Sequence, residues 1–243
     1  MTKVQLIFDF DDTIVITNPE FEKTNLQCAE VVSEAVWGDL RGVQTILAYQ
    51  RGLDLEMVKK LGLARPRFLM SWLSTYREFC RITKVAPTVA TENLLTDVVN
   101  DVYVRDFELM PHALETLDSL RKEGYSLVIL TAGEEEVQKR RVEMSGAKDF
   151  VDEVYVRNFK TPETLKEVIE WHPASEHVMI GNSLKSDIHP ALSNDIWGFH
   201  YEQETWELDH YDIETSHPKY VHLGCLTEVS PNLIQRVSSK KSA

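Results

Sequence analysis

Cysteine is scarce in this sequence of 243 residues. Cys28, Cys80 and Cys225 are its three cysteines, they lie far apart in the chain, and none belongs to a CxxC pair. An odd and sparse set argues against a disulfide framework and against a zinc site. We interpret the cysteines as small apolar packing residues in a protein of a reducing compartment.

Basic residues are also few relative to acidic ones. The chain has 26 Lys and Arg against 39 Asp and Glu, which gives a net charge of −13. Such a surface repels nucleic-acid phosphates and anionic lipid. We interpret the two basic clusters, Lys139-Arg140-Arg141 and Lys240-Lys241, as solvated surface, and we expect neither a nucleic-acid partner nor a membrane partner.

Long apolar runs are missing as well. No run approaches the roughly 20 residues that a membrane-spanning helix needs. Acidic residues appear at position 9, before the apolar region of a signal peptide could be complete. Because 43% of the residues are apolar, the chain can bury a sizeable core. We expect a soluble, cytoplasmic protein.

Short apolar runs alternate with helical patterns over much of the chain. The runs predict strands at residues 4–8, 126–130, 151–156, 177–180, 196–200 and 220–223, and helices at 111–122, 134–144, 161–171, 186–192 and 226–237. Strands that alternate with helices at this spacing are typical of a parallel sheet with crossover helices. The predicted fold class is α/β, with a doubly wound, Rossmann-like parallel sheet.

Residues 17–106 interrupt this alternation. They contain no convincing strand, and they predict helices at residues 21–36, 40–50, 53–61, 66–82 and 88–104. We therefore expect two domains: an α/β core formed by residues 1–16 and 107–243, and an all-helical module formed by residues 17–106. An insertion after the first strand would place this module over the carboxyl edge of the sheet.

Polar residues follow each of the first four predicted strands. They are Asp9, Asp11 and Asp12 after the first strand, Thr131, Ala132 and Gly133 after the second, Lys160 after the third, and Asn182, Ser183 and Asp187 after the fourth. Ligands of open parallel sheets bind at the carboxyl ends of the strands. We expect these residues to converge on one crevice.

Three carboxylates in this set, those of Asp9, Asp11 and Asp187, predict a metal site. Carboxylates that are packed together repel each other unless a cation lies between them. Oxygen ligands suit a hard cation such as Mg²⁺, which binds few protein carboxylates and completes its shell with water and substrate phosphate.

The remaining polar residues predict a phosphate site beside the metal. The Thr131 hydroxyl and the backbone N–H groups at Ala132 and Gly133 can donate to phosphate oxygens, and Lys160 can neutralise their charge. A carboxylate nucleophile, a metal, a lysine and such donors are what phosphoryl transfer needs.

In these motifs the chain resembles the haloacid dehalogenase-like (HAD) hydrolase superfamily. The matching segments are Asp9-Phe10-Asp11-Asp12-Thr13 for the family's DxDx[TV] motif, Ile129-Leu130-Thr131 for the second motif, Lys160-Thr161-Pro162 for the third, and Gly181-Asn182-Ser183-Leu184-Lys185-Ser186-Asp187 for G[DN]SxxxD. The four motifs occur in the family's order. The helical insertion at residues 17–106 resembles the family's C1 cap.

The resemblance implies a role for each motif residue. Asp9 would attack phosphorus, carry the phosphoryl group and bind Mg²⁺. Asp11 would protonate the leaving oxygen and then activate water, with its backbone carbonyl on the metal. Thr131 and Lys160 would hold the phosphoryl oxygens, and Asp187 would anchor Mg²⁺.

The chain departs from the common family pattern at two positions. Asn182 stands where many members have Asp, which gives the site one negative charge less; with Ser183 it is expected to support the metal ligands. Asp12 replaces a small residue, often Gly, of the sugar-phosphate members. Arg51, Arg65 and Arg67 of the cap are candidate contacts to an anionic substrate.

These observations favour a hydrolase of a small-molecule phosphate monoester. Other enzymes on the same scaffold stay open: a phosphotransferase or mutase, a phosphonatase that uses a cap lysine such as Lys59 or Lys60, and a dehalogenase, against which Asp11 argues. A non-catalytic regulator is the alternative from another class. The sequence does not indicate the leaving group or the oligomeric state.

Overall fold

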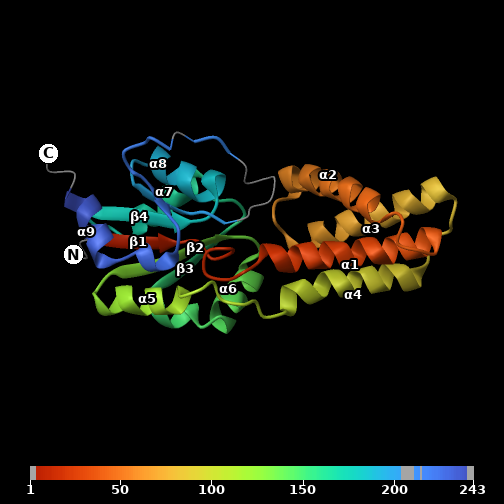
Figure 1. Cartoon of the computed structure of the whole chain (residues 1–243), viewed down its shortest axis with the longest axis horizontal. Helices are drawn as coiled ribbons and strands as arrows, with labels where there is room; N and C mark the ends of the chain where they lie inside the picture. The colour runs from red at the N-terminus through yellow and green to blue at the C-terminus, as the bar shows by residue number, and fades with distance from the viewer. Residues whose placement is uncertain (1–3, 204–210, 214, 240–243) are drawn as a thin grey trace. The chain divides into compact units, whose positions relative to one another are not determined.

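The chain divides into two compact units, one formed by Met1–Asn18 with Asp106–Ala243 and the other by Pro19–Arg105. The computed structural model describes residues 4–203, 211–213 and 215–239. Lys240 and Lys241, predicted to be solvated, lie outside the described residues. Figure 1 shows the helices and strands of each unit.

The first unit contains a six-stranded sheet in the order β3-β2-β1-β4-β5-β6. Every neighbouring pair is parallel. The strands are β1 (Val4–Phe8), β2 (Ser126–Ala132), β3 (Glu153–Arg157), β4 (Glu176–Gly181), β5 (Trp197–Tyr201) and β6 (Tyr220–Leu223). The α/β fold class and all six predicted strands are confirmed.

The strand order turns between β1 and β4. Successive strands are added outward from β1. First β2 and β3 are added on one side, and then β4, β5 and β6 are added on the other. Open sheets bind ligands at such a switch point, beyond the carboxyl ends of the strands. Phe8, the last residue of β1, lies opposite Ile129 of β2 and Ile180 of β4. The residues that follow these strands therefore emerge beside each other.

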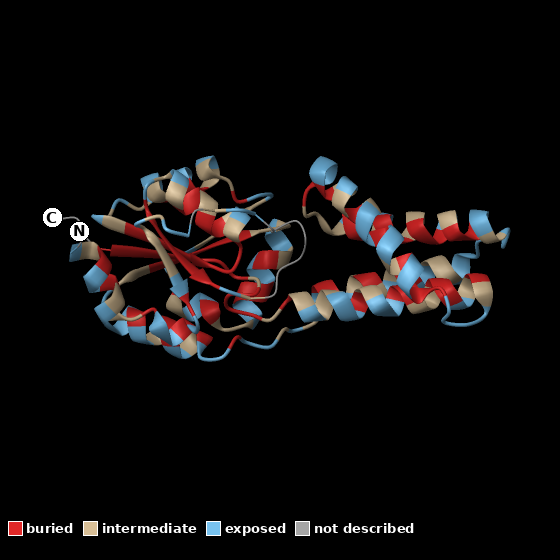
Figure 2. Cartoon of the chain, turned by 45° about the horizontal axis from the view of Figure 1, so that its top comes forward, coloured by how far each residue is buried: buried red, intermediate tan, exposed pale blue. Residues whose placement is uncertain are grey.

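Helices cover both faces of the sheet (Figure 1). Side chains alternate along a strand. Leu6 and Phe8 of β1 therefore pack with α5 (Ala113–Lys122), α6 (Glu135–Met144) and α9 (Pro231–Ser239), while Ile7 packs with α7 (Pro162–Trp171) and α8 (His189–Ser193). Figure 2 shows the strands buried between the two layers. A sheet covered on both faces needs near-continuous apolar strands, and all five residues of β1 are buried.

The second unit consists of the helices α1 (Asn18–Trp37), α2 (Val43–Leu61), α3 (Arg65–Thr83) and α4 (Val89–Val104). The prediction of separate helices at 40–50 and 53–61 is wrong, because α2 continues through Gly52. Ile46, Gln50, Asp54 and Val58 form one buried row at four-residue spacing. A helical glycine costs only about 1 kcal/mol, which burial of this row offsets.

Two predicted helices near the end of the chain are interrupted. The helix predicted at 186–192 is a π-helical turn, η2 (Leu184–Ile188), followed by α8. The helix predicted at 226–237 is a 3₁₀ turn, η4 (Leu226–Glu228), followed by α9. Pro231 lacks an N–H group and fits the first turn of a helix, so the second helix begins there.

The cysteines are free, with Cys28 and Cys80 buried and Cys225 exposed. The packing role predicted for Cys225 is therefore wrong. In the described part of the chain no helix combines the length and the apolar character that crossing a bilayer requires.

Leu120 of α5 tests the packing of this helix on the sheet, since its side chain is fully buried. Leu120→Ala is expected to lower the free energy of unfolding by about 2–5 kcal/mol, because it removes buried methyl groups and leaves a cavity. Leu109→Ala is the matched control, because Leu109 is exposed, and it should cost less than about 1 kcal/mol. Urea unfolding followed by circular dichroism measures both; equal losses would contradict the packing described.

Candidate active site

The loop after β1 is shaped by its own aspartates. The Asp9 N–H donates to the carbonyl of Ile180 at 2.8 Å, which ties this loop to the end of β4. Asp12 adopts a left-handed backbone conformation with φ of 54°. Its carboxylate accepts the backbone N–H groups of Thr17 and Asn18 at 2.8 and 2.9 Å. Burial raises the pKa of Asp12 to about 6 against the lowering effect of these two donors.

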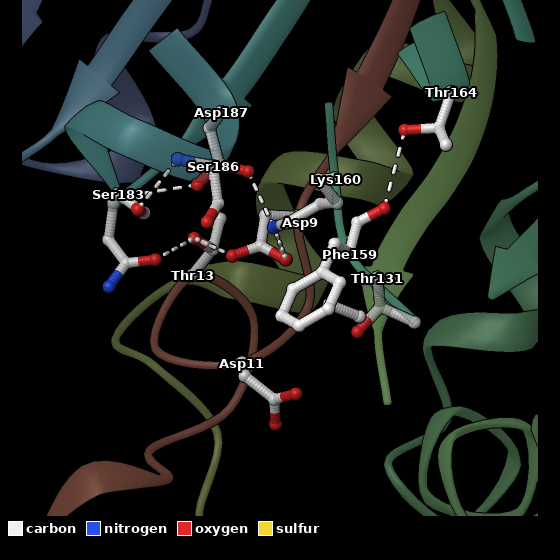
Figure 3. A network of polar contacts seen from close by, with 12 residues as sticks. Asp9, Asp11, Thr13, Thr131, Phe159, Lys160, Thr164, Ser183, Ser186 and Asp187 are labelled. Atoms are coloured by element: carbon white, nitrogen blue, oxygen red, sulfur yellow. Dashed lines mark hydrogen bonds and ion pairs between the residues drawn. The ribbon is translucent and has the colours of Figure 1, made fainter. Parts of the chain in front are cut away.

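Lys160 lies between Asp9 and Asp187 (Figure 3). Its Nζ is 2.5 Å from Oδ1 of each carboxylate, and all three side chains are buried. Lys160 precedes α7, whose first turn is fixed by Thr161: the Thr161 hydroxyl accepts the N–H of Thr164 at 3.3 Å, and Pro162 occupies the first turn. Local capping thus holds the lysine at the end of β1.

The charges of this trio do not balance, because one ammonium faces two carboxylates. Burial and the charge of Asp187 raise the pKa of Asp9 well above its ordinary value, although Lys160 lowers it. Burial alone would lower the pKa of Lys160, but Asp187 and Asp9 together raise it. A buried centre with an excess negative charge favours an additional cation.

The donors around this centre fit a hard cation such as Mg²⁺. They are carboxylate and amide oxygens, and the Thr13 hydroxyl lies 3.5 Å from Asp9 Oδ2 and 3.4 Å from Asn182 Oδ1. Within the described residues, no group of three or more His, Cys, Asp or Glu side chains is arranged to hold a metal ion. Two carboxylates and a backbone carbonyl are sufficient protein ligands for Mg²⁺, which keeps several waters.

Asp187 is fixed by its approach to the backbone of the preceding loop. The Ser183 N–H donates to Asp187 Oδ2 at 2.9 Å, and the Ser183 hydroxyl accepts the N–H of Ser186 at 3.0 Å. A Cβ atom at Gly181 would lie 2.3 Å from Asp187 Oδ2. Only glycine at position 181 leaves room for this carboxylate.

The Asp11 side chain points away from Asp9 (Figure 3). Asp11 Oδ1 accepts the Thr17 hydroxyl at 2.9 Å and pairs with Arg141 Nη2 at 2.9 Å. Asp11 Oδ2 accepts from Gln138 Nε2 at 2.6 Å. Of the three predicted metal ligands, the structure therefore brings the carboxylates of Asp9 and Asp187 together. The carboxylate of Asp11 makes a different set of contacts.

Gln138 and Arg141 are site residues that the sequence interpretation missed. The prediction that Arg141 is solvated surface is wrong, since this residue is only 8% exposed. Its guanidinium lies over the ring of Phe107, 4.1 Å from the centroid. The only signal in the sequence is the helical i, i+3 spacing of the two polar residues soon after Thr131, a spacing that exposed pairs share.

Among the predicted phosphate donors, Thr131 is buried at the end of β2 and accepts from Gln138 Nε2 at 2.6 Å. The N–H of Gly133 donates to the carbonyl of Arg157 at 2.8 Å, so this predicted phosphate donor is already engaged in a backbone hydrogen bond. The carbonyl of Ala132 accepts from Gln138 at 3.0 Å. Thr131 and Lys160 are the side chains of this predicted set that lie at the strand ends.

His200 of β5 supports the loop after β4. Its Nε2 lies 3.1 Å from the carbonyl oxygen of Asn182, and its Nδ1 lies 2.9 Å from the hydroxyl of Tyr220. Burial lowers the pKa of His200. A neutral ring that donates from Nε2 and accepts at Nδ1 satisfies both contacts and fixes the backbone of Asn182.

The three predicted cap arginines lie in the second unit. Arg51 is exposed and pairs with Glu22 at 3.1 Å. Arg67 is buried and forms an ion pair with Asp54 inside the unit. Arg65 begins α3 and is partly exposed. Their contact with a substrate stays a prediction, and for Arg67 the charge is already engaged by Asp54.

A family model described as haloacid dehalogenase-like hydrolase matches residues 6–193 of the chain. Among curated proteins, a ribulose-1,5-bisphosphate 5-phosphatase of Halopiger xanaduensis is 32% identical over 101 residues, which cover 39% of this chain and 42% of that protein. In this match the chain spans about two fifths of the relative's length.

Solved structures share the fold over nearly the whole chain. A haloacid dehalogenase-like family hydrolase from Xanthomonas campestris gives a TM-score of 0.79 at 21% identity and covers 100% of this chain and 99% of its own. A HAD phosphatase from Thermococcus onnurineus gives 0.61 at 20% identity, with 96% and 98% covered. An L-2-haloacid dehalogenase from Xanthobacter autotrophicus gives 0.59 at 17% identity, with 97% and 99% covered.

Lys160→Met tests the charge balance of the buried trio. Without the ammonium, two ionised carboxylates stay buried, and the free energy of unfolding should fall by about 3–5 kcal/mol at pH 8. The loss should be smaller at pH 5, because the raised pKa of Asp9 lets the carboxyl take up a proton in the folded state. Lys160 itself is charged at both pH values, since its pKa is raised.

Urea unfolding in the presence of EDTA measures this effect. Lys166→Met is the matched control, because Lys166 is exposed on α7, and it should change stability little at either pH. A loss for Lys160→Met that is independent of pH would contradict the assigned charges.

Proposed function

The chain belongs to the haloacid dehalogenase-like hydrolase family and is a hydrolase, and we propose that it is a Mg²⁺-dependent phosphatase that forms a phospho-aspartate on Asp9. The observation that carries this proposal is the Lys160 ammonium shared by Asp9 and Asp187. Lys160 lies at the switch point of the sheet, and Thr131 lies one residue before the end of β2. These groups are what transfer of a phosphoryl group to a carboxylate requires.

The proposed reaction has two steps. In the first, a carboxylate oxygen of Asp9 attacks phosphorus, the bond from phosphorus to the leaving oxygen breaks, and Asp11 gives its proton to that oxygen. In the second, water attacks phosphorus and gives a proton to Asp11, and the bond from phosphorus to Asp9 breaks. Inorganic phosphate leaves, and both carboxyl groups return to their starting forms.

Side chains of the chain reduce the repulsion that opposes the first step. A phosphate group that approaches Asp9 meets the buried ammonium of Lys160 beside it. The Thr131 hydroxyl can donate to a phosphoryl oxygen. Burial of Asp9 excludes water from the nucleophile, which strengthens each of these electrostatic contacts.

Mg²⁺ is the cofactor that we propose. Asp9, Asp187 and the backbone carbonyl of Asp11 would hold it, with Asn182 and Ser183 supporting them. When bound, Mg²⁺ supplies positive charge that stabilises the phosphoryl oxygens in transfer. Asp187 would be fixed for this role by the backbone N–H of Ser183.

The proposed substrate is a small-molecule phosphate monoester, and the helical unit Pro19–Arg105 is proposed to act as its cap. A phosphatase is among the relatives, although the match covers only part of both proteins. The fold itself is also that of a dehalogenase. Asp11 favours the phosphatase, because an ester oxygen needs a proton when it leaves and a halide does not.

Hydrolysis of p-nitrophenyl phosphate tests the proposed reaction. We expect turnover with Mg²⁺ that EDTA abolishes and Mg²⁺ restores. Asp9→Asn should lower kcat by at least about a thousandfold, because the nucleophile is lost, and Asp11→Asn by about a hundredfold or more. Acid-quenched enzyme should carry the phosphoryl group on Asp9.

Asp149→Asn is the control, since Asp149 is exposed, and it should retain full activity. Full activity in Asp9→Asn would overturn the nucleophile assignment. Chloride release from 2-chloropropionate without metal, with no turnover of phosphate esters, would favour a dehalogenase instead.

Gly181→Ala tests the proposed metal anchor. The added methyl group would displace the Asp187 carboxylate, so half-maximal activity should need at least about tenfold more Mg²⁺, as for the loss of contacts that orient metal ligands. Titration of activity with Mg²⁺ measures this. Gly52→Ala is the control, because no atom lies within 4 Å of the added group; the same Mg²⁺ requirement in both variants would contradict the anchor.

A further inference from the structure

Gln138 of α6 contacts two groups of the candidate site through one nitrogen. Its Nε2 lies 2.6 Å from Asp11 Oδ2, 2.6 Å from Thr131 Oγ1 and 3.0 Å from the carbonyl of Ala132. Gln138 is buried. Asp11 and Thr131 lie on different strand ends, so this amide connects the residue proposed for proton transfer with the residue proposed for phosphate binding.

The orientation of the Gln138 amide is fixed by Arg141, one helical turn further along α6. Arg141 Nη1 donates to Gln138 Oε1 at 2.9 Å. The reversed amide would place an oxygen against the Asp11 carboxylate and the Ala132 carbonyl, and a nitrogen against the guanidinium, so every one of these contacts would be repulsive. Arg141 thus decides that the NH₂ group faces the site.

We propose that Gln138 and Arg141 are positioning residues for the phosphoryl transfer proposed above, on which this inference rests. Gln138 orients the Thr131 hydroxyl and holds the Asp11 carboxylate, and Arg141 fixes the amide of Gln138 and pairs with Asp11.

The consequence for Thr131 follows from the chemistry of the amide. The nitrogen of Gln138 donates and cannot accept a hydrogen bond. The Thr131 hydroxyl therefore receives a hydrogen from Gln138, and its own hydrogen is directed to another acceptor. A phosphoryl oxygen in the crevice is such an acceptor, so Gln138 prepares Thr131 as a donor before the substrate arrives.

The consequence for Asp11 is that its hydrogen bond with Gln138 can be exchanged for another one. The NH₂ group of Gln138 has two hydrogens and three acceptors within reach. Asp11 can turn toward a substrate while Gln138 transfers that hydrogen bond to the Ala132 carbonyl. The Gln138 donor is then not left unsatisfied, which removes part of the cost of the movement.

The burial of Arg141 supports a role beyond packing. Its Nε has no hydrogen-bond partner within the described residues, while its two terminal nitrogens contact Gln138, Asp11 and Thr17. Burying a guanidinium costs free energy unless ion pairs and hydrogen bonds compensate for the lost hydration. Arg141 Nη2 lies 2.9 Å from Asp11 Oδ1, so Arg141 supplies positive charge that balances this carboxylate.

The test compares two phosphate esters whose leaving groups differ in how much they need a proton from the general acid. p-Nitrophenolate leaves readily without one, whereas the phenolate of phenyl phosphate depends more on the general acid. Gln138→Leu and Gln138→Glu should lower kcat by about tenfold or more, and the loss should be larger for phenyl phosphate. In Gln138→Glu the alkaline limb of the pH–kcat profile, where the protonated general acid is lost, should move to higher pH, because a second carboxylate would face Asp11.

Lys139→Met is the control on the same helix, since Lys139 is exposed and pairs with the exposed Glu135; it should match the wild type. Thermal unfolding checks that each variant folds, and the near-isosteric Gln138→Glu decides the question if Gln138→Leu does not fold. Wild-type pH profiles and an unchanged ratio of kcat for the two esters in the Gln138 variants would overturn the positioning role alone. Failure of the wild-type enzyme to hydrolyse either ester with Mg²⁺ would overturn the proposed function and this role together.

Discussion

The pairing of one buried ammonium with two buried carboxylates is the constraint on which the site depends. Asp9 and Asp187 follow neighbouring strands, and their mutual repulsion at this short range would open the switch point if no cation lay there. Lys160 supplies that cation from the segment before α7. The local features around the trio serve this arrangement, since the cap at Thr161 places Lys160 and the missing side chain at Gly181 admits Asp187.

The site is divided into two polar networks rather than one. Lys160 is the centre of the network that contains Asp9, the proposed nucleophile, and Gln138 is the centre of the network that contains Asp11 and Thr131. This separation has a chemical use. A nucleophile has to stay fixed during two successive steps, whereas a group that gives and then takes a proton has to reach two different oxygens. Separate supports allow Asp11 to move without disturbing Asp9.

The helical unit has a buried interior of its own. It has its own buried aromatic side chains, including Trp72 and Tyr76, and its own buried ion pair between Arg67 and Asp54. It is inserted directly after the loop that follows β1, where Asp12 accepts the N–H groups of Thr17 and Asn18 at the start of α1.

The sequence by itself determined the strands, the parallel sheet that they form, and the positions of Asp9, Thr131, Lys160 and Asp187 after the strands. Apolar runs, capping residues and motif spacing are local properties, and they are readable without the fold. Only the tertiary structure decided that Lys160 lies between two carboxylates and that Arg141 is buried against Asp11 rather than solvated. The physical reason is that the environment of a charge depends on its partners, and the partner of Arg141 lies about 130 residues earlier in the chain.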